Sequence, residues 1–168
     1  MPTGTEGAAD DPQVVGFKEQ TAVLGGVLWL CQFSELHANY PVGLLLERVL
    51  PSVELNQFRY YEDDRGAPVA FCNWALLSEE ILARALRGED RFRREDWRSG
   101  PCRFFPELIA PFGHCRWVIR DLRRNIVAPN ERTWSTRGLV TGEGDKGRPR
   151  VQRFCNVQGL VRETPPDA

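Results

Sequence analysis

The stretch from Val53 to Leu76 reads VELNQFRYYEDDRGAPVAFCNWAL and holds two runs with the composition of β-strands. The first run, Val53 to Tyr61, is rich in aromatic residues, and the second runs from Pro68 to Leu76. Between them, Glu62 to Gly66 combines acidic residues with a glycine, which is typical of a turn. Two such runs around a short turn predict a β-hairpin.

The chain before the hairpin has a helical pattern. Ala22 to Phe33 is an apolar segment that predicts a helix, although each of its two glycines weakens a helix by about 1 kcal/mol relative to alanine. We therefore expect close packing at those glycines. Between Pro41 and Pro51, apolar residues recur at i, i+3, i+4 and i+7, which predicts a second, core-facing helix. Pro41 fits its first turn, and Pro51 is expected to end it.

The chain after the hairpin alternates between helical and strand patterns. Ser78 is a candidate N-cap for a helix from Glu79 to Arg87, and Gly88 is expected to close it. A charged loop then leads to a predicted strand, Cys102 to Phe112, in which Pro106 forces a bulge or an edge position.

The last third predicts one helix and two strands. His114 to Ile126 places one apolar and one basic row on opposite sides of a helix. Thr133 to Val140 and Arg150 to Val157 predict two strands around the glycine-rich turn 142–147. The order of elements predicts an α+β fold in which helices cover a mostly antiparallel sheet.

The composition is that of one folded domain. The chain has 168 residues, of which 42% are hydrophobic, enough for a single core. We expect the domain at 21–162, a disordered tail at 1–20 and a frayed end at 163–168. No basic start precedes an apolar region, and no apolar run reaches transmembrane length, so a cytoplasmic location is expected. Five cysteines without CxxC spacing fit a reducing compartment and predict no metal site.

The charges are unevenly distributed although the net charge is −1. Arginines dominate the region from Arg84 to Arg124, and the basic row of the last predicted helix is suited to an anionic partner such as a phosphate. An ordinary solvated helix face explains the same row equally well. Nucleic-acid binding is not expected, because the net charge is slightly negative and no nucleic-acid motif is present. The row consists of Arg116, Arg120, Arg123 and Arg124.

Two histidines are the candidate proton-transfer groups. His37 follows Ser34 by three residues, and helical spacing would place the serine hydroxyl beside the imidazole. Histidine suits proton transfer because its unperturbed pKa lies near neutrality. A hydrogen-bonded structural histidine is the alternative interpretation. A thiol enzyme that pairs Cys31 or Cys115 with a histidine is a further alternative.

Several stretches together resemble the RTX toxin-activating lysine acyltransferases, the hemolysin-activating type of protein. The resemblance implies a GNAT-like single-domain fold and transfer of a long-chain fatty acyl group to internal lysines of an RTX-type protoxin. It implies acyl-acyl carrier protein as the donor and no bound cofactor, and it makes a homodimer possible. The matching stretches, in the family's order, are Leu24 to Leu30 with Ser34 to His37 and Tyr40 to Val42, then Val49 to Pro51 with Gln57 and Phe58, Pro68 to Ala75, Trp97 to Gly100, and Ile109 to Gly113.

The resemblance assigns roles to individual residues. His37 lies at the position of the family's catalytic histidine, and Ser34 at that of the motif serine. The family's second position, a carboxylate directly after A-P-F-G, is His114 here. A neutral imidazole can accept a proton but supplies no negative charge, and Asp121 is a distant candidate to replace it. Within this resemblance, the basic row of the last helix would bind the phosphopantetheine phosphate and the acidic carrier protein.

The substitution at His114 leaves three interpretations open. The chain is a working variant with a His–His pair, a paralogue with a changed donor or target, or a weakened relative that acts as a binding or adaptor protein for a toxin or a carrier protein. We favour retained acyl transfer. The turn at 142–147 lacks the helix that would grip a pyrophosphate, which agrees with a carrier-protein donor.

Overall fold

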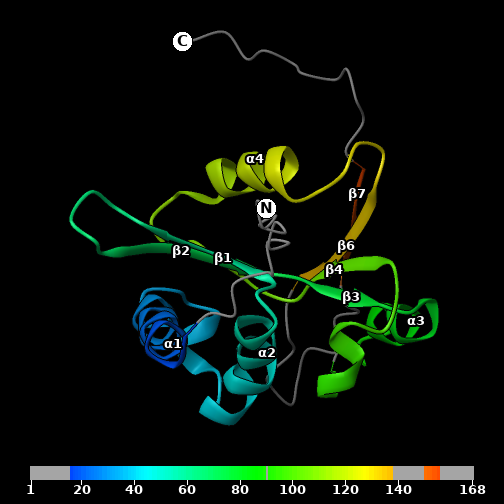
Figure 1. Ribbon diagram of the computed structural model, residues 1–168, viewed down its shortest axis with the longest axis horizontal. Helices are drawn as coiled ribbons and strands as arrows, with labels where there is room; N and C mark the ends of the chain where they lie inside the picture. Colours follow the sequence, from blue (N-terminus) through cyan, green and yellow to red (C-terminus); the bar gives the residue numbers. More distant parts are fainter. Residues whose placement is uncertain (1–15, 90, 138–149, 156–168) are drawn as a thin grey trace, which may run out of the picture.

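A computed structural model describes residues 16–89, 91–137 and 150–155 (Figure 1). Its helices and strands form an α+β fold, as the order of elements predicted. The elements in chain order are α1 (Phe17–Cys31), the short 3-10 helix η1 (His37–Asn39), α2 (Val42–Glu54), β1 (Phe58–Glu62), β2 (Pro68–Asn73), β3 (Ala75–Leu77), α3 (Glu79–Leu86), η2 (Arg94–Trp97), β4 (Cys102–Phe105), β5 (Leu108–Ile109), α4 (Cys115–Asn125), β6 (Arg132–Arg137) and β7 (Arg150–Cys155).

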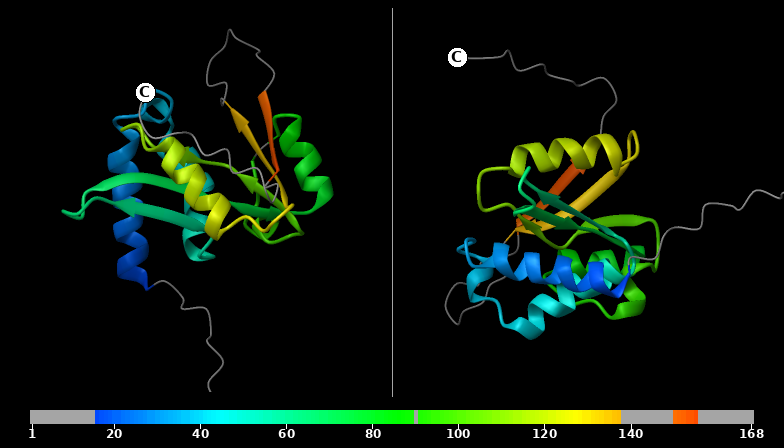
Figure 2. Two further views of the ribbon diagram at one scale, coloured as in Figure 1. Left: turned by 90° about the horizontal axis from the view of Figure 1, so that it is seen from above. Right: turned by 60° about the vertical axis from the view of Figure 1, so that its left-hand side comes forward.

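The strands of the described residues form two small sheets. The first has the order β1-β2-β5 and is antiparallel throughout. The second has the order β3-β4-β6-β7, in which only the β4–β6 pairing is parallel. Helices α1 and α2 lie on one face of the first sheet and α4 lies on the other (Figures 1 and 2). Because successive side chains of a strand point to opposite faces, β2 packs Phe71 against α1 and α2 and Cys72 against α4.

The hairpin is confirmed, because β1 and β2 pair in antiparallel register, with Gly66 in the turn at a φ of 78° that favours glycine. Its strands are shorter than predicted: Val53 and Glu54 belong to α2, β1 begins at Phe58, and the second predicted strand divides after Asn73. Close packing is confirmed at one of the two helical glycines. A side chain at Gly26 would overlap the phenol of Tyr60 on β1, whereas Gly25 has open space. The short helix α3 also begins as expected, since the Ser78 hydroxyl accepts the backbone N–H of Ile81 at 3.3 Å.

Two chain segments pass from one sheet to the other, and we call this place the junction. Trp74 separates β2 from β3, and Pro106 with Glu107 separates β4 from β5. The segment 102–112 was therefore wrongly predicted as one strand. Proline has no N–H for the ladder, so β4 ends before Pro106. β4 lies inside the second sheet, and β5 lies at the edge of the first. At the junction the Asn73 N–H donates to the backbone oxygen of Glu107 at 3.2 Å.

Other boundaries also differ from the predictions. α2 continues through Pro51 to Glu54, so the prediction that this proline ends the helix was wrong. Ser52 and Val53 are fully buried, and the Ser52 hydroxyl donates to the backbone oxygen of Val49 at 2.6 Å, so packing outweighs the missing N–H. α1 begins at Phe17, so residues 17–20, assigned to the tail, are helical. The predicted turn 142–147, residues 1–15 of the tail and the frayed end 163–168 lie outside the described residues.

None of the helices in the described ranges is both long and apolar enough to span a membrane.

Candidate active site

His37 lies in a tight turn between α1 and α2. After α1 ends, the N–H of Ser34 donates to the Cys31 oxygen at 3.1 Å, and the N–H of Ala38 donates to the Ser34 oxygen at 2.8 Å. These turns bring the Ser34 hydroxyl to 2.6 Å from Nδ1 of His37. The serine–histidine contact expected from the spacing is therefore present. Only 6% of His37 is exposed, whereas Ser34 is half-buried, so the serine is the more accessible of the two.

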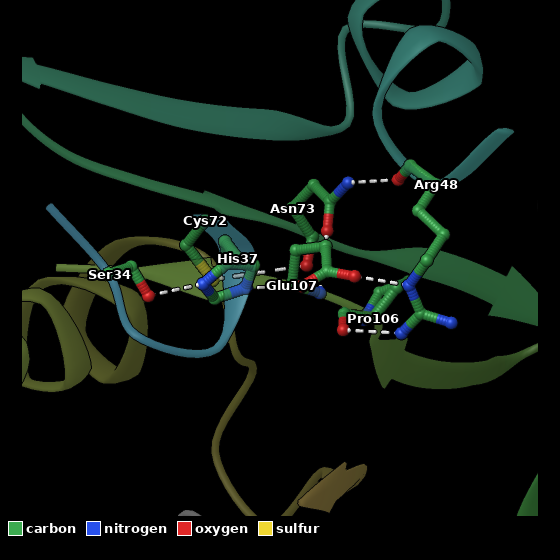
Figure 3. Close-up of polar contacts among 7 residues, drawn as sticks. All are labelled: Ser34, His37, Arg48, Cys72, Asn73, Pro106 and Glu107. Carbon is green, nitrogen blue, oxygen red and sulfur yellow. Dashed lines mark hydrogen bonds and ion pairs between the residues drawn. The ribbon is translucent and has the colours of Figure 1, made fainter. Parts of the chain in front are cut away.

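The other ring nitrogen of His37 faces a carboxylate that the sequence reasoning missed. Nε2 lies 2.9 Å from Oε2 of Glu107, at the junction (Figure 3). Glu107 is 4% exposed, so this contact is screened from water. Ser34, His37 and Glu107 thus form a chain of hydrogen bonds that leads from the half-buried hydroxyl to a buried anion. We call this chain the relay.

A buried arginine holds the far side of this carboxylate. Arg48 comes from α2 and is 6% exposed. Its Nε donates to Oε1 of Glu107, and its Nη2 donates to the Pro106 oxygen at 2.8 Å. Glu107 therefore lies between an imidazole and a guanidinium. A guanidinium is always charged and cannot accept a proton from the histidine. Arg48 therefore holds the carboxylate in place without acting as a proton acceptor itself.

Asn73 connects the elements that carry these groups. It is fully buried at the end of β2, and its Nδ2 donates to the Arg48 oxygen at 2.7 Å and to Ser52 Oγ at 3.0 Å. Its Oδ1 accepts the Glu107 N–H at 3.0 Å. One amide thus ties β2, α2 and the junction together, and it satisfies the backbone N–H of Glu107 where the chain passes between the sheets.

The electrostatic environment keeps Glu107 ionised. Burial alone would raise the pKa of its carboxyl, but the hydrogen bond from His37 and the positive charge of Arg48 outweigh burial and lower that pKa below its ordinary value. An ionised carboxylate can only accept, so the His37 Nε2 carries the hydrogen of this contact. In the neutral ring, Nδ1 then has the free lone pair, and the Ser34 hydroxyl donates to it. The arrangement is that of a hydroxyl, a base and an orienting carboxylate.

The buried thiols near Glu107 are poor nucleophiles. Burial, and secondly the charge of Glu107, raise the pKa of Cys31 to about 11. The same causes raise the pKa of Cys72 further above the ordinary thiol value. Both thiols are therefore protonated at neutral pH, and only the thiolate is strongly nucleophilic. No hydrogen bond joins a cysteine, Cys115 included, to a histidine within the described residues, which weakens the thiol-enzyme alternative.

His114 is not part of the relay. It occupies the N-cap position of α4 without a capping hydrogen bond from its side chain, and its buried Nδ1 has no hydrogen-bond partner among the described residues. Within that same part of the chain, no hydrogen bond or ion pair joins it to His37. Asp121 is engaged elsewhere, because it accepts the Tyr61 hydroxyl at 2.7 Å and the Asn125 amide at 2.6 Å. The carboxylate on His37 is thus Glu107, and a catalytic role for His114 stays a prediction.

The four arginines of the basic row lie exposed on α4, opposite the apolar row that buries Val118 and Leu122. The predicted helix and both of its faces are confirmed. Whether the row binds a phosphate or a carrier protein stays a prediction. The row is Arg116, Arg120, Arg123 and Arg124.

The missed residues left a signal in the sequence. Arg48 falls between Leu45 and Val49, two positions of the apolar stripe of the second predicted helix, where a charge needs a partner. Glu107 is a single carboxylate in an apolar run that follows a proline. Two unlike charges in apolar settings are candidates for a buried pair, although nothing local indicates that they meet.

Comparison with known proteins identifies the group to which this chain belongs. Residues 17–155 match the model of the RTX toxin acyltransferase family. The chain belongs to this family. It is therefore an acyltransferase. Lysine-acyltransferase RtxC of Vibrio cholerae serotype O1 is 47% identical over 134 residues, which cover 79% of this chain and 88% of that protein.

Two relatives have names that specify the transferred group. The protein-lysine myristoyltransferase HlyC of Escherichia coli is 43% identical over 104 residues, or 62% of this chain and 61% of that protein. The protein-lysine myristoyltransferase RtxC of Kingella kingae is 36% identical over 101 residues, or 60% of each chain. The predicted family is confirmed, and these relatives act on protein lysines.

Proposed function

We propose that this protein transfers a long-chain fatty acyl group from acyl-acyl carrier protein to internal lysines of an RTX-type protoxin. The observation that carries the proposal is the Ser34–His37–Glu107 relay. Family membership and the names of the relatives support the reaction class. The proposal includes a GNAT-like arrangement of the sheets and a cytoplasmic location, where a carrier-protein donor and unpaired thiols belong.

The relay supplies the proton transfer that this reaction requires. A neutral lysine amine attacks the thioester carbonyl, a C–N bond forms, and the C–S bond breaks. The amine nitrogen must lose one proton, which passes to Nδ1 of His37, directly or through the Ser34 hydroxyl that already donates to that nitrogen. The imidazolium then returns a proton to the departing thiolate. The Glu107 carboxylate stabilises the imidazolium, because it accepts a hydrogen bond from Nε2.

The test combines the full chain with long-chain acyl-acyl carrier protein and a protoxin, and measures acylated lysine by intact mass. His37→Ala should lower the rate roughly 10²- to 10⁴-fold, as expected for loss of a general base. Asn39→Ala is the matched control, since Asn39 is exposed in the same short helix. A fall of less than about threefold in His37→Ala would remove the proposed role of this histidine.

A weakened relative that acts as a binding or adaptor protein is the second candidate, and the histidine at the family's carboxylate position favours it. This candidate predicts no acyl addition by the wild-type protein, together with toxin or carrier-protein binding that survives His37→Ala. Acyl addition by the wild type that disappears in His37→Ala would exclude it. A homodimer remains a prediction, and β5, the edge strand of the first sheet that follows Pro106, is the strand at which we expect two copies to pair.

A further inference from the structure

Three aromatic side chains form an exposed group beside the relay, which we call the aromatic cluster. Its members are Trp29, Phe33 and Phe112. The ring centroids lie 4.8 Å apart for Trp29 and Phe33, 5.2 Å for Phe33 and Phe112, and 5.9 Å for Trp29 and Phe112. Their exposed fractions are 40%, 48% and 43% in the order named. Each ring thus contacts the other two rings and also exposes part of its surface to solvent.

The cluster is built on the two chain segments that carry the relay. Phe33 directly precedes Ser34, whose hydroxyl contacts His37. Phe112 lies in the segment between β5 and α4, a few residues after Glu107. The C-terminal end of α1 and the loop that leads into α4 lie side by side, as the ring contacts require (Figure 2). The two segments that carry the ends of the relay, Ser34 and Glu107, therefore also carry the aromatic cluster.

We propose that the aromatic cluster binds the acyl chain of the donor and so brings its thioester to Ser34 and His37. This inference rests on the proposed function, because that function supplies a long apolar substrate. The size of the surface agrees with it. Three half-exposed aromatic rings offer roughly 300 Å², whereas each partner of a stable protein interface contributes about 800 Å². The cluster is thus large enough for a hydrocarbon chain and too small to hold a second copy by itself.

The mutual contacts of the three rings also fit this ligand. Two of the rings neighbour fully buried residues in the sequence: Leu30 directly follows Trp29, and Ile109 lies three residues before Phe112. A hydrocarbon chain offers no hydrogen bonds, so its position can be fixed only by the shape of an apolar surface. Rings that already pack against one another lose less side-chain entropy on binding than separate exposed side chains would.

Binding can be measured without catalysis. Bromine-labelled myristic acid is titrated into the full chain, because bromine quenches the fluorescence of a nearby indole. The wild type should be quenched in a saturable way, and Trp29→Phe should lose that quenching. Trp117→Phe is the matched control: Trp117 is 51% exposed on α4 and packs against Tyr61, outside the cluster. Labelled butyric acid at the same concentration should quench little, since its chain is too short to cover the rings.

A second variant tests the surface without changing a tryptophan. Phe112→Ala should weaken the affinity for the labelled myristic acid roughly tenfold, the effect of losing one ring face. In acyl transfer, it should raise the apparent KM for the long-chain donor by a similar factor and leave kcat nearly unchanged.

The outcomes separate this inference from the proposed function. Equal quenching in Trp29→Phe and Trp117→Phe would overturn the inference, and so would a dimer that dissociates in Phe112→Ala while fatty-acid affinity is unchanged. Acyl transfer with an unaltered KM in Phe112→Ala would also overturn it, and the proposed function would stand. Quenching that follows the expected pattern in a protein that acylates no lysine would support the binding surface and contradict the proposed function.

Discussion

Replacing Glu107 with glutamine removes the negative charge between His37 and Arg48 and keeps the shape of the side chain. Hydrogen bonds to charged groups contribute about 1.5–3 kcal/mol each, and removing one partner of a buried ion pair costs about 3–5 kcal/mol. Arg48 keeps its bond to the Pro106 oxygen at 2.8 Å, which limits the loss. We therefore expect Glu107→Gln to lower the free energy of unfolding by about 3–4 kcal/mol.

The same change should slow acyl transfer. The amide oxygen can still accept from Nε2 of His37, but it cannot stabilise the imidazolium that forms when the lysine loses its proton. We expect the rate to fall roughly 10²- to 10⁴-fold in protein that is still folded. Urea unfolding measures the stability, and the appearance of acyl-lysine by intact mass measures the rate.

Glu131→Gln is the matched control for this variant. Glu131 forms a half-buried ion pair with Arg103, with Nε and Oε1 2.7 Å apart, away from the relay. The control should lose some stability and keep its rate. Glu107→Asp, which keeps the charge, provides a second variant if the glutamine form does not fold. Transfer by folded Glu107→Gln within about threefold of the wild type would refute the reasoning that this carboxylate supports His37.

The remaining predictions concern pH and the N-terminal end of α4. The pKa of Glu107 is lower in the folded protein than its ordinary value of 4.5, so its contribution to stability is complete above that pH and is lost as the pH falls toward the lowered value. The urea midpoint should therefore drop more steeply below pH 4.5 in the wild type than in Glu107→Gln, and equal slopes would contradict this account. His114→Asp should raise the free energy of unfolding by about 0.5–1 kcal/mol, because an anion at a helix N-terminus is favourable. Its transfer rate should match or exceed that of the wild type, and abolished transfer would show that His114 takes part in the chemistry.

The parts of the fold that the sequence predicted well depend on neighbours in the chain. The hairpin, the helix capped by Ser78, the two faces of α4 and the contact between Ser34 and His37 all follow from spacings of a few residues. The continuation of α2 through Pro51 could not be predicted in this way, because propensity was outweighed by tertiary burial.

The residues of the site were harder still to predict from local patterns. Glu107 follows His37 by 70 residues and Arg48 by 59, so no local pattern joins them. They meet because two chain segments pass from one sheet to the other at the junction, which only the assembled topology reveals. The resemblance to the family directed attention to His114, whereas the structure places the anion seven residues earlier in the chain.

The junction between the sheets has a consequence for how activity responds to partial unfolding. Asn73 lies on β2 and holds groups from α2 and from the segment between β4 and β5, so the site is in place only after these separate units have docked. Opening of either sheet edge would misalign the imidazole and its anion while most helices stayed intact. Acyl transfer would then be among the first properties lost as conditions become destabilising, ahead of any change in helical content. The range of conditions over which the enzyme transfers acyl groups would then be narrower than the range over which its fold persists.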